Sequence, residues 1–464
     1  MAGRTIHFVS LGCPKNRVDT EIMLGVSDHA GFRAVERAED AEIIVVNTCG
    51  FIDAAKEESI RTILDLAEHK RTGRCDRLVV AGCLSQRYSD QLAADMPEID
   101  HLLGSSDMLS LERVLDGDAE RMLVGNPAEH LTRASDPRRL SQAPHSAYLK
   151  IAEGCNRTCS FCAIPAIRGP QRSRPMADVV AEAEQLVSLG VVELNLVSQD
   201  TIAWGRDLPD RPRLATLARS VADVPGVRWV RLHYLYPETL DSALLEVLAE
   251  HPRVLPYVDM PLQHVSDRVL RRMRRGHGGA RPRRLIESLR RRVPAVVIRT
   301  ALIAGHPGEG DDDFDELCDF LRWAELDHVG VFVYSHEEGT RAGTMTDRAP
   351  RKTARARQRK LLSIQRAISR RKLRSRIGYE LDVIVEGVSS ESDLLLEGRW
   401  WGQAPEVDGK VVLANGSARP GEIRRALVTD ASHYDLVADL LSPDGARDAP
   451  PAHQRRRPVR LRTL

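Results

Sequence analysis

Short apolar runs alternate with helical stretches over the first quarter of the chain. The runs TIHFVSLG, AEIIVVNTCG and RLVVAGCL are rich in β-branched residues, and segments with helical spacing separate them. Strands that alternate with helices pair in parallel, because each helix carries the chain back to the start of the next strand. The pattern predicts a βαβαβ domain with a parallel sheet over residues 1–115.

A second and longer alternation follows a predicted linker at 116–145. It runs through SAYLKIAEGC, VELNLVSQD, WVRLHYL, YVDMPLQH, VVIRTALIAG and HVGVFVYS. Six strands are too few for a complete (βα) barrel, which has eight and usually takes about 250 residues. We therefore predict a partial (βα)6 barrel over residues 146–348, which makes the chain an α/β protein.

Three further segments are predicted after the barrel. Residues 349–376 form a basic helix, and residues 377–440 contain short alternating strands broken by Gly, Pro and Asn, the pattern of a small all-β barrel. Residues 441–464 are rich in Pro and Arg and poor in apolar residues, so they are expected to be a disordered tail.

The composition is that of an ordinary water-soluble protein, with 42% hydrophobic and 29% charged residues. No run approaches the roughly 18 apolar residues of a membrane-spanning helix, and the N-terminus lacks the apolar stretch of a signal peptide. We expect a cytoplasmic enzyme with no membrane contact. Its eight cysteines are then expected to serve metals or catalysis, because cytoplasmic thiols are kept reduced.

Three cysteines form a tight motif directly after a strand. In AEGCNRTCSFCAIP, Cys155, Cys159 and Cys162 have the spacing C-x-x-x-C-x-x-C. Three thiolates on one loop suit three corners of a [4Fe-4S] cluster and leave the fourth iron open to a cofactor or substrate. A structural zinc site is the alternative, but it normally has four ligands and no fourth stands beside this triplet.

Three other cysteines are far apart in sequence but each follows a predicted strand. Cys13, Cys49 and Cys83 end the runs HFVSLGC, IIVVNTC and VVAGC. The carboxyl ends of parallel strands meet at one edge of a sheet, where ligands bind in open α/β folds. We predict a second [4Fe-4S] cluster there, with core packing as the alternative. Cys75 and Cys318 fit neither set and are expected to be structural.

The three-cysteine loop at the mouth of a partial barrel resembles the radical S-adenosylmethionine superfamily. The resemblance implies that the open iron chelates S-adenosylmethionine and that one electron splits it into methionine and a 5′-deoxyadenosyl radical. It also implies cofactor contacts on two barrel strands, namely Glu193, Ser198, Gln199, Arg299 and Gly305. The alternatives are a surface charge at Glu193 and a simple turn at Gly305.

With its N-terminal cysteine domain and its C-terminal barrel, the chain resembles the methylthiotransferases from about residue 5 to 440. The motifs LGCPKNRVDTE, CNRTCSFCAIP, LVSQDT, YSHEEGT and GQAPEVDG look most like the branch that modifies ribosomal protein twelve of the small subunit on an aspartate β-carbon. The sister branch modifies adenosine in tRNA.

The resemblance implies roles for the domains and for both cysteine sets. The C-terminal barrel would be the substrate-recognising TRAM domain, and sulfur bound at the Cys13, Cys49 and Cys83 cluster would be coupled to the target carbon. All six cysteines of the two sets are then both metal ligands and catalytic groups. An electron donor such as flavodoxin or ferredoxin would be required.

The charge of the C-terminal barrel bears on the substrate. Residues 377–440 contain 12 acidic and 5 basic side chains, an excess of seven negative charges that would repel RNA and attract a basic protein. This favours the ribosomal protein over tRNA. Because the helix at 349–376 and the tail are basic, tRNA remains an alternative substrate. A second alternative is a non-catalytic iron–sulfur protein that binds ribosomes. Trp400 and Trp401 either contact the partner or close the barrel core.

Overall fold

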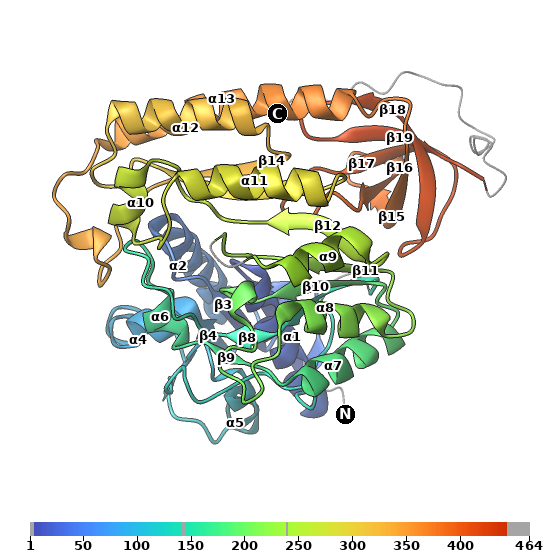
Figure 1. Cartoon of the computed structure of the whole chain (residues 1–464). Coiled ribbons are helices and arrows are strands. Elements are labelled where there is room, and N and C mark those ends of the chain that lie inside the picture. Colours follow the sequence, from blue (N-terminus) through green and yellow to red (C-terminus); the bar gives the residue numbers. More distant parts are fainter. Residues whose placement is uncertain (1–3, 142–143, 238–239, 443–464) are drawn as a thin grey trace.

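The computed structural model describes residues 4–141, 144–237 and 240–442, in which three domains pack against one another (Figure 1). A parallel sheet, a partial (βα) barrel and a closed small barrel follow one another along the chain, which confirms the fold class predicted from the sequence. The predicted tail lies almost wholly outside the described residues. No described helix combines the length and the hydropathy that a membrane crossing demands.

The N-terminal domain contains one parallel sheet of six strands in the order β2-β1-β3-β4-β5-β6. Its strands are β1 (Thr5–Ser10), β2 (Arg33–Ala34), β3 (Ile43–Thr48), β4 (Arg77–Gly82), β5 (His101–Leu103) and β6 (Met122–Leu123). Its helices are α1 (Pro14–His29), α2 (Asp53–Ala67), α3 (His69–Thr72), α4 (Cys83–Asp95) and α5 (Leu111–Asp116). β3 is buried along its whole length because helices cover both faces of the sheet. β6 adds a strand within the segment expected to be a linker.

The central domain is a six-stranded parallel sheet in the order β14-β13-β12-β11-β10-β7, left open between its two edge strands. Its strands are β7 (Ser146–Lys150), β10 (Glu193–Val197), β11 (Trp229–Leu232), β12 (Val254–Asp259), β13 (Val297–Ala304) and β14 (His328–Val333). Helices α7 (Met176–Ser188), α8 (Leu214–Asp223), α9 (Ser242–Glu250), α10 (Asp267–Met273), α11 (Ala280–Arg292) and α12 (Asp311–Ala324) alternate with them. A two-stranded sheet, β8 (Ala152–Glu153) with β9 (Arg172–Ser173), flanks the cysteine loop and the short helix α6 (Ile164–Arg168).

The C-terminal domain is a closed barrel in the order β15-β16-β17-β19-β18. Its strands are β15 (Glu380–Ser389), β16 (Ser392–Trp400), β17 (Val411–Asn415), β18 (Ile423–Ala431) and β19 (Leu436–Leu440). Its core continues into Trp229 and Val297 at the amino ends of barrel strands, so the two barrels share apolar contacts. Trp400 is 2% exposed and belongs to this core, which corrects its alternative role as a partner contact.

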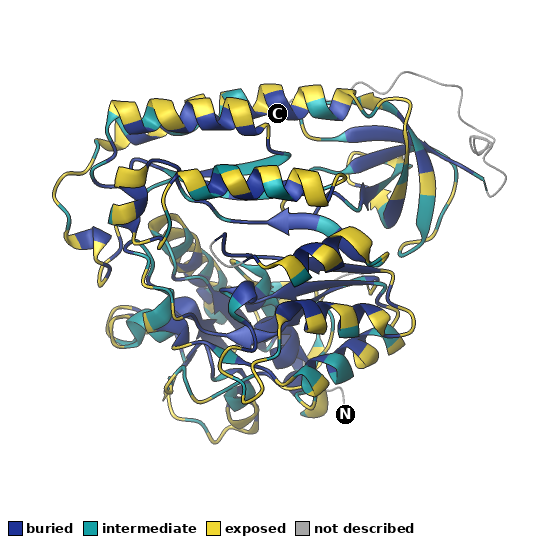
Figure 2. Ribbon diagram, in the orientation of Figure 1, coloured by how far each residue is buried: buried dark blue, intermediate teal, exposed yellow. Residues whose placement is uncertain are grey.

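Helix α13 (Arg351–Arg374) connects the two barrels along one edge of the molecule (Figure 1). Leu361 and Ile368 are buried on its inner face, where the helix packs on β14 and α12. The opposite face is exposed along the length of the helix (Figure 2). A largely apolar stripe at helical spacing orients this helix, and the one charged side chain buried in that stripe, Arg357, is paired with Glu309.

Candidate functional site

The N-terminal cysteines meet at the carboxyl edge of the first sheet. Cys49 follows β3 directly, Cys83 begins α4 directly after β4, and Cys13 is the N-cap of α1. The Asn16 Oδ1 atom lies 3.8 Å from the Cys13 sulfur and 3.6 Å from the Cys83 sulfur. The three thiols therefore share one small space, as parallel strand order predicts.

Two glycines allow this close approach. Gly12 has φ +91°, and a Cβ there would come 2.8 Å from the Cys49 Cβ and 3.1 Å from its sulfur. A Cβ on Gly50 would come 2.7 Å from the Leu84 Cα, beside Cys83. Any side chain at either position would push the cysteine turns apart, so the glycines are part of the thiol site.

The second cysteine set occupies the loop between β8 and α6. Arg275 Nη1 lies 3.4 Å from the Cys159 sulfur, and the Arg157 amide donates to the Cys155 sulfur at 3.4 Å. The loop is also tied to the end of β13, because Ser160 Oγ lies 3.3 Å from His306 Nε2. The loop thus stands at the carboxyl end of the barrel strands, where ligands bind in barrel enzymes.

Helix α6 joins the two cysteine sets. It begins two residues after Cys162, and Ala163 and Ile167 pack against Cys83 in one small apolar cluster. From the last residue of the helix, the Arg168 guanidinium reaches the Cys83 sulfur at 3.3 Å and Asn16 Oδ1 at 2.6 Å. One short helix therefore connects a ligand loop of the barrel to the thiols of the N-terminal sheet.

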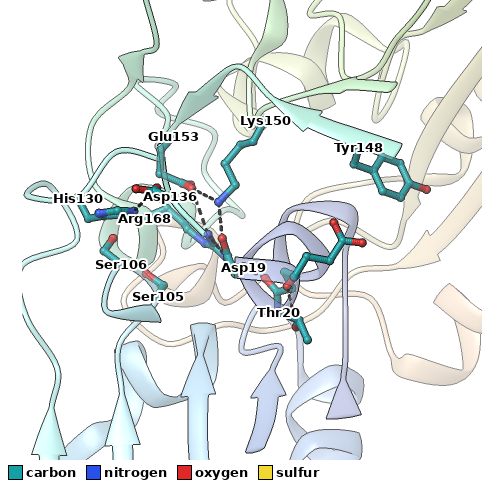
Figure 3. A network of polar contacts seen from close by, with 12 residues as sticks. Asp19, Thr20, Ser105, Ser106, His130, Asp136, Tyr148, Lys150, Glu153 and Arg168 are labelled. Carbon is teal, nitrogen blue, oxygen red and sulfur yellow. Dashed lines mark hydrogen bonds and ion pairs between the residues drawn. The ribbon is translucent and has the colours of Figure 1, made fainter. Parts of the chain in front are cut away.

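A buried charged network surrounds this junction (Figure 3). Arg168 Nη1 lies 2.9 Å from Asp19 and 3.3 Å from Glu153, while Lys150 contacts Asp19 and lies 2.9 Å from Glu153. All four side chains are at most 5% exposed. Two cations facing two carboxylates make a neutral set, which is how buried charges are tolerated.

The network keeps the carboxyl group of Glu153 ionised. Burial alone would raise the pKa of Glu153, but Lys150 and Arg168 outweigh burial and hold that pKa well below its usual range. Lys15 is a second buried cation near the N-terminal thiols. Burial alone would lower the pKa of Lys15, but Tyr234 and Cys13 outweigh burial and raise that pKa. The Lys15 ammonium lies 3.8 Å from the Tyr234 ring centroid. The N-terminal thiols are thus flanked by two buried cations.

Burial desolvates several of these thiols. Burial raises the pKa of Cys49 to about 12, with Cys83 and Cys13 adding to the effect. Burial likewise raises the pKa of Cys162 to about 12 and that of Cys155 to about 11. A thiol is protonated at neutral pH under these conditions, and a bound metal displaces that proton.

Each set offers three thiols, the number of protein ligands that a four-iron cluster with one open iron would take. In the described parts of the chain, no three His, Cys, Asp or Glu side chains converge closely enough to hold one metal ion. A cluster spreads its thiolates over separate irons, and three cysteines leave one iron open. The buried Arg168 and Lys15 suit the negative charge that thiolate-bound clusters carry.

Four of the predicted cofactor residues lie in three different surroundings. Ser198 and Gln199 follow β10 at its carboxyl end, and Gln199 Nε2 donates to Glu153 Oε1 at 2.7 Å. Arg299 lies inside the barrel, 3.0 Å from Asp259 and 3.4 Å from Asp408 of the C-terminal barrel. Gly305 has φ +81° and follows β13, where a Cβ would come 2.4 Å from Ala354 of α13. Close helix packing therefore accounts for Gly305.

Glu193 differs from the expectation. It is the first residue of β10, at the end of the strand remote from the cysteine loop. Its carboxylate binds Arg231 at 3.0 Å and Arg399 of the C-terminal barrel at 2.6 Å, and it is fully buried. Glu193 therefore joins the two barrels, which replaces the cofactor contact expected from the sequence.

This buried pairing predicts a pH dependence of stability. Burial alone would raise the pKa of Glu193, but Arg399 and then Arg231 lower it to about 2. A carboxylate with a depressed pKa stabilises the fold above its unfolded value and loses that contribution as the pH falls through the folded value. The contribution is about 3 kcal/mol. We expect Glu193→Gln to remove this part of the decline in unfolding free energy between pH 5 and pH 2, measured by urea titration. An unchanged decline would contradict the prediction.

Comparison with known proteins agrees with this geometry. The model of the "Radical SAM superfamily" matches residues 149–321, that of "Uncharacterized protein family UPF0004" matches 5–104, and that of the "TRAM domain" matches 377–441. The ribosomal protein uS12 methylthiotransferase of Sorangium cellulosum is 62% identical over 95% of this chain and 92% of its own length. Those of Anaeromyxobacter and Myxococcus xanthus are 48% and 47% identical, over 96% and 97% of this chain and 95% and 96% of theirs.

The chain belongs to the ribosomal protein uS12 methylthiotransferase family. The family resemblance inferred from the cysteine motifs is thereby confirmed. Membership of the radical SAM superfamily supports S-adenosylmethionine and iron–sulfur as its cofactors.

Solved structures share the fold at low sequence identity. The radical S-adenosylmethionine methyltransferase TsrM from Kitasatospora setae has a TM-score of 0.54 at 14% identity, covering 74% of each chain. The cobalamin-dependent S-adenosylmethionine radical enzyme OxsB has a TM-score of 0.51 at 12% identity, covering 78% of this chain and 56% of its own. These likenesses show the fold alone.

Sequence reasoning about this family member missed the network around Arg168. Lys150 and Glu153 interrupt the apolar run YLKIAEGC immediately before the cysteine loop. Charged side chains within a buried run must be paired, so this interruption of the apolar run indicates a buried charge network. Their partners Asp19 and Arg168 lie 131 and 18 residues from Lys150, and no local pattern identifies them.

Proposed function

We propose that this chain methylthiolates ribosomal protein uS12, on an aspartate β-carbon, with two four-iron clusters and S-adenosylmethionine as cofactors. The observation that supports it is the direct connection of two three-cysteine sets through α6. Cys155, Cys159 and Cys162 would hold the radical cluster, and Cys13, Cys49 and Cys83 the sulfur-donating cluster. A location in the cytoplasm follows from a ribosomal substrate.

When bound, one cluster would pass an electron from an external donor to S-adenosylmethionine, whose cleavage gives the hydrogen-abstracting radical. The other cluster would hold the sulfur, and a second S-adenosylmethionine would supply its methyl group. A cofactor radical is needed because an unactivated C–H bond is beyond side-chain acid or base chemistry. The chain's own residues position and insulate these cofactors. Arg168 donates to the Cys83 sulfur and holds Asn16 against the N-terminal thiols. Lys150 keeps Glu153 ionised, and Gln199 is oriented by that carboxylate at the carboxyl end of β10. Ser198, Gln199 and Arg299 remain our candidates for contacts with S-adenosylmethionine.

The charge of the C-terminal barrel supports a basic protein as the substrate. An excess of seven negative charges at residues 377–440 attracts a basic chain and disfavours RNA at this domain. The loop of the GQAPEVDG motif contacts both other domains. Glu406 pairs with Arg17 of α1 in the N-terminal domain at 2.8 Å, and Asp408 accepts a hydrogen bond of 2.6 Å from Tyr257 of the central domain. The acidic domain is therefore fixed relative to the cysteine sets.

An electron donor such as flavodoxin or ferredoxin would have a suitable approach beside Cys159. A cavity of about 730 Å³ lies there, and its lining includes Thr158, Arg271, Arg274, Arg275 and His277. Arg271 and Arg274 are exposed, whereas Arg275 is buried and contacts the Cys159 sulfur. An acidic redox protein would be steered to such a surface, and electron-transfer contacts are typically small.

The variant Arg271→Glu/Arg274→Glu tests this approach. We expect cleavage of S-adenosylmethionine driven by reduced flavodoxin to fall about tenfold at low salt, because two attractive charges become repulsive. Cleavage driven by dithionite, which needs no docking surface, should stay within twofold of the wild-type rate. An equal loss with both reductants would place these arginines in the cluster site and contradict the docking role.

Mass spectrometry of uS12 tests the proposed function. The chain is reconstituted anaerobically, analysed for iron and sulfide, and incubated with reductant, S-adenosylmethionine and uS12. About eight irons per chain and a methylthio mass gain on one aspartate would support the proposal, because two four-iron clusters are its central requirement. About four irons, or zinc, would remove the sulfur-donating cluster. Eight irons per chain together with modification of tRNA in place of uS12 would assign the chain to the tRNA-modifying branch.

A further inference from the structure

Helix α13 presents an unusually one-sided charge. Its 24 residues contain eleven Lys and Arg and no Asp or Glu. Nine of the basic side chains are exposed, namely Arg351, Lys352, Arg355, Arg359, Lys360, Arg366, Arg370, Arg371 and Arg374. The inner face packs on the central domain and includes Arg357, which pairs with Glu309 at 2.7 Å. The opposite face is exposed (Figure 2), and the nine exposed basic side chains lie away from the protein core.

The carboxyl half of this helix forms one wall of a groove of about 540 Å³. The groove is lined by Ser363, Arg366, Ala367, Arg370, Arg371, Arg374 and, from the turn between β18 and β19, His433. Arg366, Arg370 and Arg374 are four residues apart and so share one side of the helix. Each step advances about 6 Å along the axis. We call these residues the α13 groove.

The positive charge of the groove is only partly neutralised within the protein. Arg371 pairs with Glu325 at 2.6 Å on the side of the helix toward α12. Among the described residues, Arg366, Arg370 and Arg374 form no ion pair. Like charges four residues apart repel each other and weaken the helix unless an external anion offsets them. The row of three arginines is therefore suited to a chain of anionic groups.

The lining favours a phosphate backbone over an acidic protein. Protein interfaces usually have apolar or aromatic anchors at their centre, whereas the only aliphatic side chain of this groove is that of Ala367, beside Ser363, His433 and four arginines. Guanidinium groups bind phosphate in a bidentate manner, and every Lys or Arg in the groove lining is an arginine. Phosphate contacts position a protein on a nucleic acid without reading its sequence.

We propose that the α13 groove binds the phosphate backbone of ribosomal RNA, so that the enzyme acts on uS12 within an assembled small subunit. This inference rests on the proposed function. Two adjacent surfaces of opposite charge support it, because an acidic C-terminal barrel suits a basic protein and the arginine groove suits the RNA around that protein. A free ribosomal protein would engage only the acidic surface.

The triple variant Arg366→Glu/Arg370→Glu/Arg374→Glu tests the inference on full-length reconstituted enzyme. Binding to purified small ribosomal subunits, measured by co-sedimentation over a salt series, is expected to weaken at least about 30-fold. The slope of log affinity against log salt should become shallower by about 2 to 3, since each lost phosphate contact removes nearly one unit. Methylthiolation of free uS12 should stay within twofold of wild type, while that of the subunits falls with binding.

A matched control separates this site from general charge effects. Arg33→Glu/Arg61→Glu/Arg74→Glu makes the same change in net charge at exposed positions of the N-terminal domain, and it should bind subunits almost as wild type does. Equal subunit binding by the wild type and the α13 variant would overturn the inference. The inference would also be overturned if the α13 variant lost as much activity on free uS12 as on the subunits. The same holds if that variant lost activity only when a protein donor, and not dithionite, supplied the electron. If the wild type binds subunits in the expected salt-dependent way but modifies no form of uS12, the proposed function is wrong. RNA binding by the α13 groove would still be supported in that case.

Discussion

Replacing Cys13, Cys49 and Cys83 together with alanine is expected to abolish methylthio product while leaving reductive cleavage of S-adenosylmethionine in place. The three thiols converge at one edge of the first sheet and are the ligands we assign to the sulfur-donating cluster. Without them, iron should fall from about eight to about four per chain, since one of two four-iron clusters is lost. Product formation should fall at least about 1,000-fold, because no other route supplies sulfur to the substrate carbon.

The measurement combines iron and sulfide analysis with two mass-spectrometric assays, one for 5′-deoxyadenosine and one for modified uS12. Cys75→Ala/Cys318→Ala is the matched control, because both cysteines are buried and lie outside the two sets. That control should keep about eight irons and full product formation. Persistent product from the triple variant would show that the N-terminal set does not deliver sulfur, and loss of all iron would show that the two sites do not form independently.

The sequence was sufficient for the fold class and for the convergence of distant cysteines. Continuous apolar runs separated by helices predict parallel strands, and parallel strands place Cys13, Cys49 and Cys83 at one edge whatever the distance between them in the chain. The radical loop is local, so its motif alone groups Cys155, Cys159 and Cys162. Both inferences depend on geometry that every parallel sheet shares.

The residues that connect the sites could not be predicted in this way. Glu193 occupies the amino end of β10, and its partner Arg399 comes from a domain whose docking position no periodicity reveals. Arg168 looks like an ordinary basic residue at a helix end, yet it meets Asp19 of the N-terminal domain. Contacts between domains depend on how whole faces fit, and that information is spread over many residues.

The connecting role of Arg168 leads to the second large effect. Arg168→Ala is expected to lower the free energy of unfolding by about 3 to 5 kcal/mol, because it leaves buried carboxylates with only one cation. Asp19 and Glu153 would then share Lys150, and the hydrogen bonds to Cys83 and Asn16 would be lost. Urea unfolding of the metal-free chain measures this, provided that the first two domains unfold in one transition.

A second-site change distinguishes lost charge balance from lost packing. In the Arg168→Ala background, Asp19→Asn removes one carboxylate and restores equal numbers of positive and negative charges around Lys150, so it should recover at least 1 kcal/mol, about the size of coupling expected for contacting charged residues. Asp19→Asn alone should destabilise, because it leaves two cations facing Glu153 only. Strictly additive losses would mean that Arg168 acts through packing on Cys83 and α6, and the charge-network explanation would then be wrong. Recovery would establish that the junction between the two cysteine sets is held by a balanced set of buried charges, in which Arg168 connects the domains.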